Sequence, residues 1–306
     1  MPSTVVTQDA AAETAPPETA PTEVKPRHAQ PLVLAAVAFA VLTPLIQNLA
    51  GMGLTQAEFA ARGDSTLRVE GYAFSIWGLI YAGLIIHAVR QAVPGPDVAG
   101  LRRRLAWPAI AALVGIGVWI VVAAMGLQVA SVVVIFFSLL VLLVPLLSFS
   151  ARIRGLNLTA PDRWMTVWPL AALAGWLTVA APLNLINAAT ALNTLPPALP
   201  PTAWALTAVA AAAGLALIGV LSLRTLAYPL PVAWGLIGAF VAEQARNPVL
   251  GFTALGVALV LITVSAIVVF GFSRRKGRTL KGDTSATVAF DGVSSAGTAD
   301  TGAESR

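Results

Sequence analysis

Eight long apolar runs, none of which contains an Asp, Glu, Lys or Arg, lie between Leu32 and Phe270. A helix needs about 17–25 apolar residues to cross the hydrocarbon core of a bilayer. Seven runs have this length, and the seventh in order is shorter and opens with two prolines. The sequence therefore predicts an all-α polytopic membrane protein with eight transmembrane helices, at Leu32–Leu49, Tyr72–Val89, Leu105–Met125, Ala130–Phe149, Val167–Ile186, Ala203–Leu223, Tyr228–Ala242 and Val249–Phe270.

The composition agrees with this class and excludes others. Only 11% of the residues are charged, whereas soluble domains have about 25%. Residues 1–31 and 273–306 are polar and carry few bulky apolar side chains, so we expect both to be disordered tails. The chain has no cysteine, which excludes a disulfide framework, a thiolate nucleophile and a cysteine-based metal site.

The basic residues divide unequally between the two sides of the predicted membrane helices. Fifteen Lys and Arg residues lie near the span ends on one side, against Arg62, Arg68 and Arg246 on the other. Because cytoplasmic loops collect Lys and Arg, both termini are predicted to be cytoplasmic. This placement explains a pI near 10.2 without a nucleic-acid partner. The clusters Arg102–Arg104 and Arg274–Lys276 either set the topology or also contact anionic lipids.

The segment Gly51–Gly71 is the longest loop on the predicted outer side. It is either a cap over a site that opens outward or a solvated connector, since loop length alone does not specify a role. Its charged residues are Glu58, Arg62, Asp64, Arg68 and Glu70.

Aromatic residues form a stripe on the second predicted helix. Phe74, Trp77 and Tyr81 are spaced three and four residues apart, so they share one helix face. Gly78 is expected to allow close packing beside the Trp77 ring. A Trp and a Tyr one turn apart offer a flat stacking surface with an N–H and an O–H donor. The alternatives are helix packing and an aromatic belt at the membrane interface.

The fifth predicted helix carries a ring, small residues and amides on one face. That face holds Trp176, Ala180, Leu183, Asn184 and Asn187. In a membrane a buried amide needs a partner, so Asn184 either bonds across helices for structural reasons or meets a polar edge of a ligand.

These two helices resemble the translocator protein family, also called TspO/MBR or tryptophan-rich sensory proteins. The pattern Phe74-x-x-Trp77-x-x-x-Tyr81 is similar to the family's second-helix motif. The pattern Trp176-x-Thr178-x-Ala180-x-x-x-Asn184 is similar to its fifth-helix motif, and Trp119 stands where the family commonly has a Trp. The resemblance covers residues 32–190, a five-helix bundle. Residues 191–272 look like the three additional membrane helices of longer bacterial members.

The resemblance implies a protein of the bacterial inner (plasma) membrane with a ligand pocket near the outer leaflet, capped by the first outer loop. Such a pocket takes flat hydrophobic molecules, above all tetrapyrroles such as porphyrin or haem, as ligands rather than required cofactors. The ligand-binding positions implied are Phe74, Trp77, Tyr81, Trp119, Trp176, Ala180 and Asn184. The chain departs from the family at Gly115-Ile116, where an Asn is frequent, and at Val69-Glu70-Gly71, which replaces a Trp-Pro-rich segment.

Two other functions stay open. The spans lack acidic residues, which disfavours ion-coupled transport but leaves transport of a hydrophobic or neutral small molecule. No Ser/His pair, paired carboxylates or His-Glu-x-x-His motif suggests catalytic or metal-binding residues. The remaining enzymatic alternative, light-dependent porphyrin degradation with Trp77 and Trp176 as reactants, comes from the resemblance alone.

Three further features are interpreted as structural. His87 is expected to be a polar residue at a helix end rather than a haem ligand. Glu243 and Arg246 are expected to stay hydrated at the outer end of the seventh helix. The small residues of Ala208–Gly214 support helix packing either within one chain or in a homodimer.

Overall fold

The computed structural model describes residues 29–95, 97 and 100–294, with side chains described as far as Gly271. Most of the predicted N-terminal tail and residues 295–306 lie outside the described residues. Regular structure in the described residues is entirely helical. In chain order the elements are α1 (Ala29–Leu49), α2 (Gln56–Ala61), η1 (Gly71–Ser75), α3 (Ile76–Ala92), α4 (Leu101–Ala124), α5 (Gln128–Ser148), α6 (Ser150–Gly155), η3 (Arg163–Val167), α7 (Trp168–Ala191), α8 (Pro201–Leu223), α9 (Pro229–Glu243) and α10 (Pro248–Ser294).

The predicted membrane-spanning class is confirmed. Each of the eight apolar runs lies on a helix, and seven helical segments are long and apolar enough to cross a membrane. The eighth, α9, has 15 residues, which corresponds to about 22 Å of helix, less than the roughly 30 Å hydrocarbon core. Because α9 is packed among α7, α8 and α10, it needs no full-length contact with lipid. The count of eight spans is therefore approximate.

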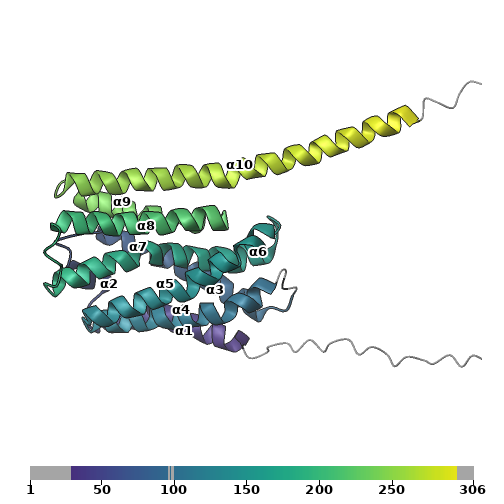
Figure 1. The fold of residues 1–306 in the computed structure, drawn as a ribbon. Coiled ribbons are helices and arrows are strands. Elements are labelled where there is room, and N and C mark those ends of the chain that lie inside the picture. The colour runs from purple at the N-terminus through teal and green to yellow at the C-terminus, as the bar shows by residue number, and fades with distance from the viewer. Residues whose placement is uncertain (1–28, 96, 98–99, 295–306) are drawn as a thin grey trace, which may run out of the picture.

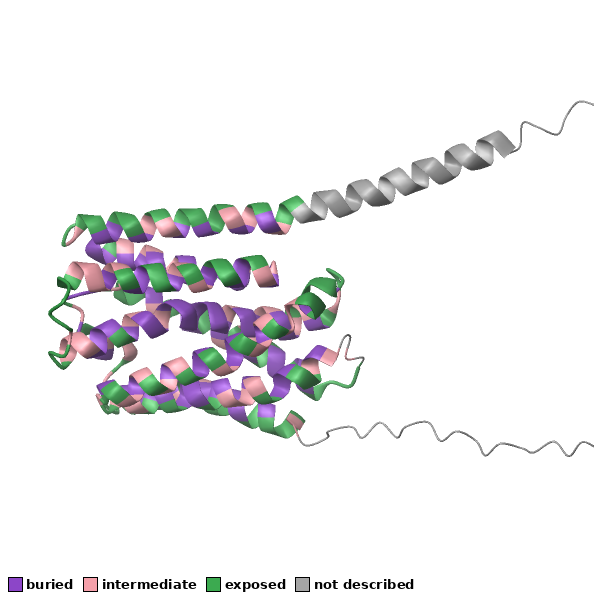
Figure 2. Ribbon diagram, in the orientation of Figure 1, coloured by how far each residue is buried: buried purple, intermediate pink, exposed green. Residues whose placement is uncertain are grey.

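The helices form a stack in which α7 occupies the centre. In Figure 1, α10 lies at one edge, followed by α9 and α8, then α7, then α5 and α3, and finally α4 and α1. Helix α7 contacts α3 and α5 on one side and α8 and α9 on the other. In its most apolar window 78% of the residues are buried, against 22–56% in the other spans. Figure 2 shows this helix as an almost continuous buried band.

Large apolar side chains cover the outside of the bundle. Leu79 on α3, Leu140 on α5 and Ile267 on α10 are more than half exposed. So many apolar side chains facing outward suit a hydrocarbon solvent rather than water. The chain is accordingly a multi-pass membrane protein.

Tyr228, fully buried just before α9, joins α7 to the C-terminal helices. Its hydroxyl lies 2.9 Å from Oγ1 of Thr178 on α7. A Cβ added at Gly175 would lie 2.0 Å from the carbonyl oxygen of Tyr228, and one added at Gly219 would lie 2.0 Å from its ring. Glycine at both positions therefore allows α7, α8 and Tyr228 to approach each other.

One expectation about the C-terminal region differs from the structure. Residues 273–294, predicted from composition to be disordered, continue α10 as helix to Ser294. After Pro248 the chain contains no proline, so no residue in this segment lacks the backbone donor that a helix requires.

Candidate functional site

The loop between α1 and η1 folds over the end of the bundle and contains its own short helix. Thr55 and Glu58 form a capping box at the start of α2: the Thr55 amide donates to Glu58 Oε2 at 2.8 Å, and the Glu58 amide donates to Thr55 Oγ1 at 3.2 Å. The hydrogen bonds from Thr55 lower the pKa of Glu58 below its ordinary value. This loop is called the capping loop below, and it comprises residues 51–71.

Beneath the capping loop, the aromatic residues of η1, α3 and α7 meet in one cluster. The ring centroids of Trp77 and Trp176 are 6.1 Å apart at 78°, and that of Phe74 is 6.3 Å from Trp176 at 79°. Tyr81 stacks on Trp77 at 5.3 Å. Both of these indoles are at most 6% exposed, so they point into the protein rather than toward lipid.

A small central cavity brings together six of the seven residues predicted to bind a ligand. Its volume is about 30 Å³, and Phe74, Trp77, Trp119, Trp176, Ala180 and Asn184 line it, joined by further residues of α2, α5 and α7. The seventh, Tyr81, lines an adjoining cavity instead. Ligand sites commonly measure about 300–1,000 Å³, so the central cavity alone is closed to a planar guest in this conformation.

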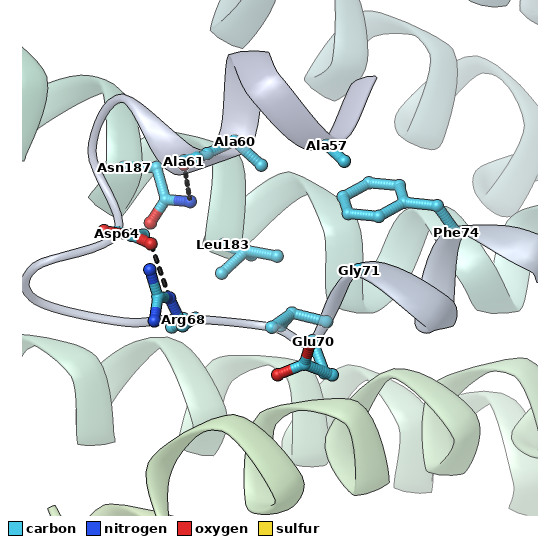
Figure 3. A pocket seen from close by; sticks show the side chains of 11 residues that line it. Ala57, Ala60, Ala61, Asp64, Arg68, Glu70, Gly71, Phe74, Leu183 and Asn187 are labelled. Atoms are coloured by element: carbon cyan, nitrogen blue, oxygen red, sulfur yellow. Dashed lines mark hydrogen bonds and ion pairs between the residues drawn. The ribbon is translucent and has the colours of Figure 1, made fainter. Parts of the chain in front are cut away.

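Two larger cavities flank the central one. The first, of about 430 Å³, lies among α1, α2 and α3 and includes Trp77 and Tyr81 in its wall. The second, of about 270 Å³, lies between the capping loop and α7. Figure 3 shows Asp64, Arg68 and Asn187 at one end of this second cavity and Phe74 at the other. Phe74 borders all three cavities, so its ring lies where the three spaces come closest to one another.

Several polar atoms around these cavities are buried without a protein partner. Among the described residues they include Nε1 of Trp77, Nε1 of Trp119, the Tyr81 hydroxyl and Oδ1 of Asn187. An unsatisfied buried donor or acceptor costs roughly 1–3 kcal/mol. The site therefore offers mainly donors next to the aromatic rings and one acceptor, Asn187, toward the second cavity.

Asn184 forms an interhelical hydrogen bond, one of the two roles that the sequence suggested for it. Its Nδ2 donates to Ser131 Oγ on α5 at 3.0 Å, and Ser131 Oγ donates to the Gln128 carbonyl at 2.7 Å. Asn184 also lines the central cavity, so the interhelical bond holds it at the wall.

The departure from the family at Gly115 has a packing explanation. A Cβ at this position would lie 2.2 Å from Ser138 Oγ on α5. The absence of a side chain at Gly115 therefore lets α4 and α5 pack closely.

The structure corrects three sequence-based expectations. Gly78 does not support close packing, because nothing lies within 4 Å of a Cβ built there. His87 is fully buried beside Met165 of η3 rather than at a hydrated helix end, and it lines none of the cavities described above. Glu243 is only 2% exposed rather than hydrated, and its buried carboxylate accepts the Arg68 amide at 2.7 Å.

Sequence reasoning missed the polar half of the site. The helical spacing placed Asn187 on the same face of α7 as Trp176 and Asn184, so the sequence could have indicated it. No pattern in the sequence indicated that Asp64 and Arg68 of the capping loop lie at the site. Arg68 Nε pairs with Asp64 Oδ2 at 2.5 Å, and Asn187 Nδ2 donates to the Ala60 carbonyl at 3.3 Å. The first contact lies within the loop, and the second joins the loop to α7 across 127 positions of sequence.

Comparison with known proteins identifies a family but no close relative. The model of a family described as TSPO-like protein matches residues 30–267. The match runs beyond the five-helix unit 32–190 and includes α8, α9 and most of the apolar part of α10. No curated protein and no solved structure matches the chain significantly.

Proposed function

We propose that this chain, which belongs to the TSPO-like family, is a membrane receptor or sensor that binds a flat hydrophobic ligand, such as a porphyrin or haem, in the aromatic site under the capping loop. The observation that carries the proposal is the cluster of Phe74, Trp77 and Trp176 with unpartnered donors beside it. Ring faces bind a planar molecule by stacking, and a few placed polar groups orient it.

Each part of the site has a distinct role in this proposal. The indoles of Trp77 and Trp176 provide the stacking surface. The N–H of Trp119 and the hydroxyl of Tyr81 donate to carboxylate or carbonyl groups of the ligand, while Ala180 leaves room beside the rings. Movement of the Phe74 ring joins the small central cavity to its larger neighbours, which creates the volume that a planar guest requires.

The remaining proposals concern the orientation in the membrane, the partners and the oligomeric state. The distribution of Lys and Arg supports cytoplasmic termini, which place the capping loop and the site toward the outer leaflet of a bacterial inner membrane. Porphyrin or haem is proposed as a ligand rather than a required cofactor, and membrane lipid is the second expected partner. A homodimer stays a proposal, since Ala208 and Ala212 of α8 are already buried within one chain.

The test is an absorbance titration of purified protein with haem and with protoporphyrin. Replacing both Trp77 and Trp176 with Ala removes the stacking surface. Because buried aromatic contacts at binding sites are typically worth about 1–3 kcal/mol each, we expect affinity to fall by at least tenfold. A double variant of Trp164 and Trp204, which line none of these cavities, is the matched control. Equal affinity in the two double variants would refute the site.

The same preparation distinguishes the two alternatives. Loss of the Soret band under light, but not in the dark, and only with Trp77 and Trp176 present, would indicate photochemical degradation. Uptake of a hydrophobic solute into proteoliposomes, without retention by the protein, would indicate transport.

A further inference from the structure

Helix α9 contacts the second half of the capping loop and the start of η1, which follows it. The Trp234 indole donates to the Ala73 carbonyl at 2.9 Å, and its ring meets Tyr72 edge-on at 5.5 Å. The Glu70 amide donates to the Gly238 carbonyl at 3.1 Å. At the end of the helix, the carboxylate of Glu243 accepts the Arg68 amide at 2.7 Å.

The contact between α9 and the loop is also close in its packing. A Cβ at Gly238 would lie 2.9 Å from Ala73 Cβ and 3.0 Å from Val69 Cγ1. Just beyond α9, the Arg246 guanidinium donates to the carbonyl oxygens of Asp64 and Ser65 at 3.3 Å. Hydrogen bonds and packing from α9, together with the bonds from Arg246 just beyond it, thus hold residues 64–73.

The other half of the capping loop has different supports. The Leu54 amide donates to the Ala124 carbonyl of α4 at 3.0 Å, and Gln47 of α1 donates to the Leu54 carbonyl at 2.7 Å. Helix α2 contacts α4. The loop is therefore attached to α1 and α4 along residues 54–61 and to α7 at Ala60 and Thr66. The contacts with α9 and Arg246 cover residues 64–73, which include the start of η1.

The half attached to α9 forms part of the wall of the site. Arg68, Glu70 and Gly71 line the second cavity together with three alanines of α2. The Trp234 bond ends on Ala73, the residue directly before Phe74. Phe74 borders all three cavities and directly follows Ala73, so a displacement of this segment would also displace the ring. We propose that α9 anchors the capping loop, with Trp234, Gly238 and Glu243 as positioning residues that keep the site closed and control access to it. The part of this inference that concerns access rests on the proposed function.

The native chain has no cysteine, so single thiols can report on opening of the loop. Thr66 in the anchored half and Thr225 in the connection between α8 and α9 are both buried, at 6% and 3% exposed. Thr66→Cys should react with a water-soluble maleimide only when the loop opens, and Thr225→Cys reports on opening elsewhere.

Two changes loosen the anchor by different means. Trp234→Phe keeps a ring but removes the N–H donor, and Gly238→Ala pushes against Val69 and Ala73. In either background we expect labelling at position 66 to become about five- to tenfold faster, the change that loss of one such interaction produces in an opening equilibrium. Labelling at position 225 should stay unchanged. The control, Trp204→Phe, removes an equivalent indole bond to the Pro196 carbonyl, also 2.9 Å long, and should leave both rates unchanged.

The outcomes separate this inference from the ligand proposal. Unchanged labelling at position 66, or equal acceleration at position 225, would overturn the anchor, since the second result means general destabilisation. The labelling experiment needs no ligand, so a failure to bind haem would reject the proposed function and leave the anchor intact. If haem binds with the same association rate in the loosened variants as in the unmodified chain, the role of α9 in access is wrong.

Discussion

Replacing Gly175 with Ala tests whether the C-terminal helices and the aromatic site form one packed unit. The new Cβ would lie 2.0 Å from the Tyr228 carbonyl oxygen, about 1.4 Å inside an ordinary van der Waals contact of 3.4 Å. The obstacle is backbone rather than the end of a flexible side chain. The side chain of Tyr228 is in turn held by Thr178 at 2.9 Å, so neither partner can move freely.

The sign of the stability change is itself diagnostic. In an exposed helix interior, Gly→Ala stabilises by roughly 0.5–1 kcal/mol through backbone entropy. Overpacking a filled interior costs about 1–3 kcal/mol, and contact with backbone places Gly175→Ala near the upper end. Because Trp176 is the next residue on α7, displacement of the helix should also weaken haem binding.

The assay is denaturant unfolding in detergent, followed by Trp fluorescence, with haem titration on the same samples. Gly214→Ala on α8 is the matched control, since nothing lies within 4 Å of its Cβ, and it should be neutral or slightly stabilising. If Gly175→Ala is as stable as Gly214→Ala, the close approach of α7 to Tyr228 is wrong. Loss of stability with unchanged haem affinity would instead refute the coupling of this contact to the site.

Three further outcomes are expected. Ser131→Ala should destabilise by about 1 kcal/mol in unfolding experiments, because it leaves the Asn184 amide without its partner, whereas Ser148→Ala, whose hydroxyl bonds only within its own helix, should change little. Gly78→Ala should leave stability and haem affinity unchanged, and a large loss of either would restore the close packing first expected there. The lowered pKa of Glu58 means that its carboxylate stabilises α2 above the ordinary pKa of 4.5. This contribution is lost as the pH falls through the lowered pKa, so hydrogen exchange in α2 should accelerate in acid, and Glu58→Gln should remove that pH dependence.

Local periodicity was sufficient to predict the membrane helices and the aromatic face of the site. Charge-free apolar runs locate helices because the bilayer requires their length. Spacings of three and four residues place Trp77 beside Tyr81 and Trp176 beside Ala180, since these relations lie within single helices. That Trp77 and Trp176 face each other could not follow from either helix alone, and it came from the resemblance to a family.

The polar contacts of the capping loop could not be predicted in the same way. Glu243 lies at the end of a helix beside Arg246, a pattern typical of a hydrated ion pair. In the structure it is buried under the capping loop, where a backbone amide 175 positions away donates to it. For Gly78 the error is the reverse. A glycine next to Trp77 suggested a closely packed position, but Gly78 lies on the outer face of α3 with nothing packed against it. In both cases the local pattern was compatible with two environments, and long-range packing selected one.

The arrangement of α7 shows that the additional helices and the aromatic cluster form one packed unit, and it predicts that the site depends on them. A helix at the edge of a five-helix bundle would need an apolar outer face toward lipid, but α7 presents Gly175 and Thr178 to Tyr228 on that side. Removing the C-terminal helices would expose this close-packing surface and the Thr178 hydroxyl, and it would release the half of the capping loop that α9 holds. A chain that ends at residue 191 should therefore retain the aromatic residues of the site and still lose haem binding. Haem affinity equal to that of the full chain, in a truncated chain that remains folded and monodisperse, would show that α8–α10 serve another purpose.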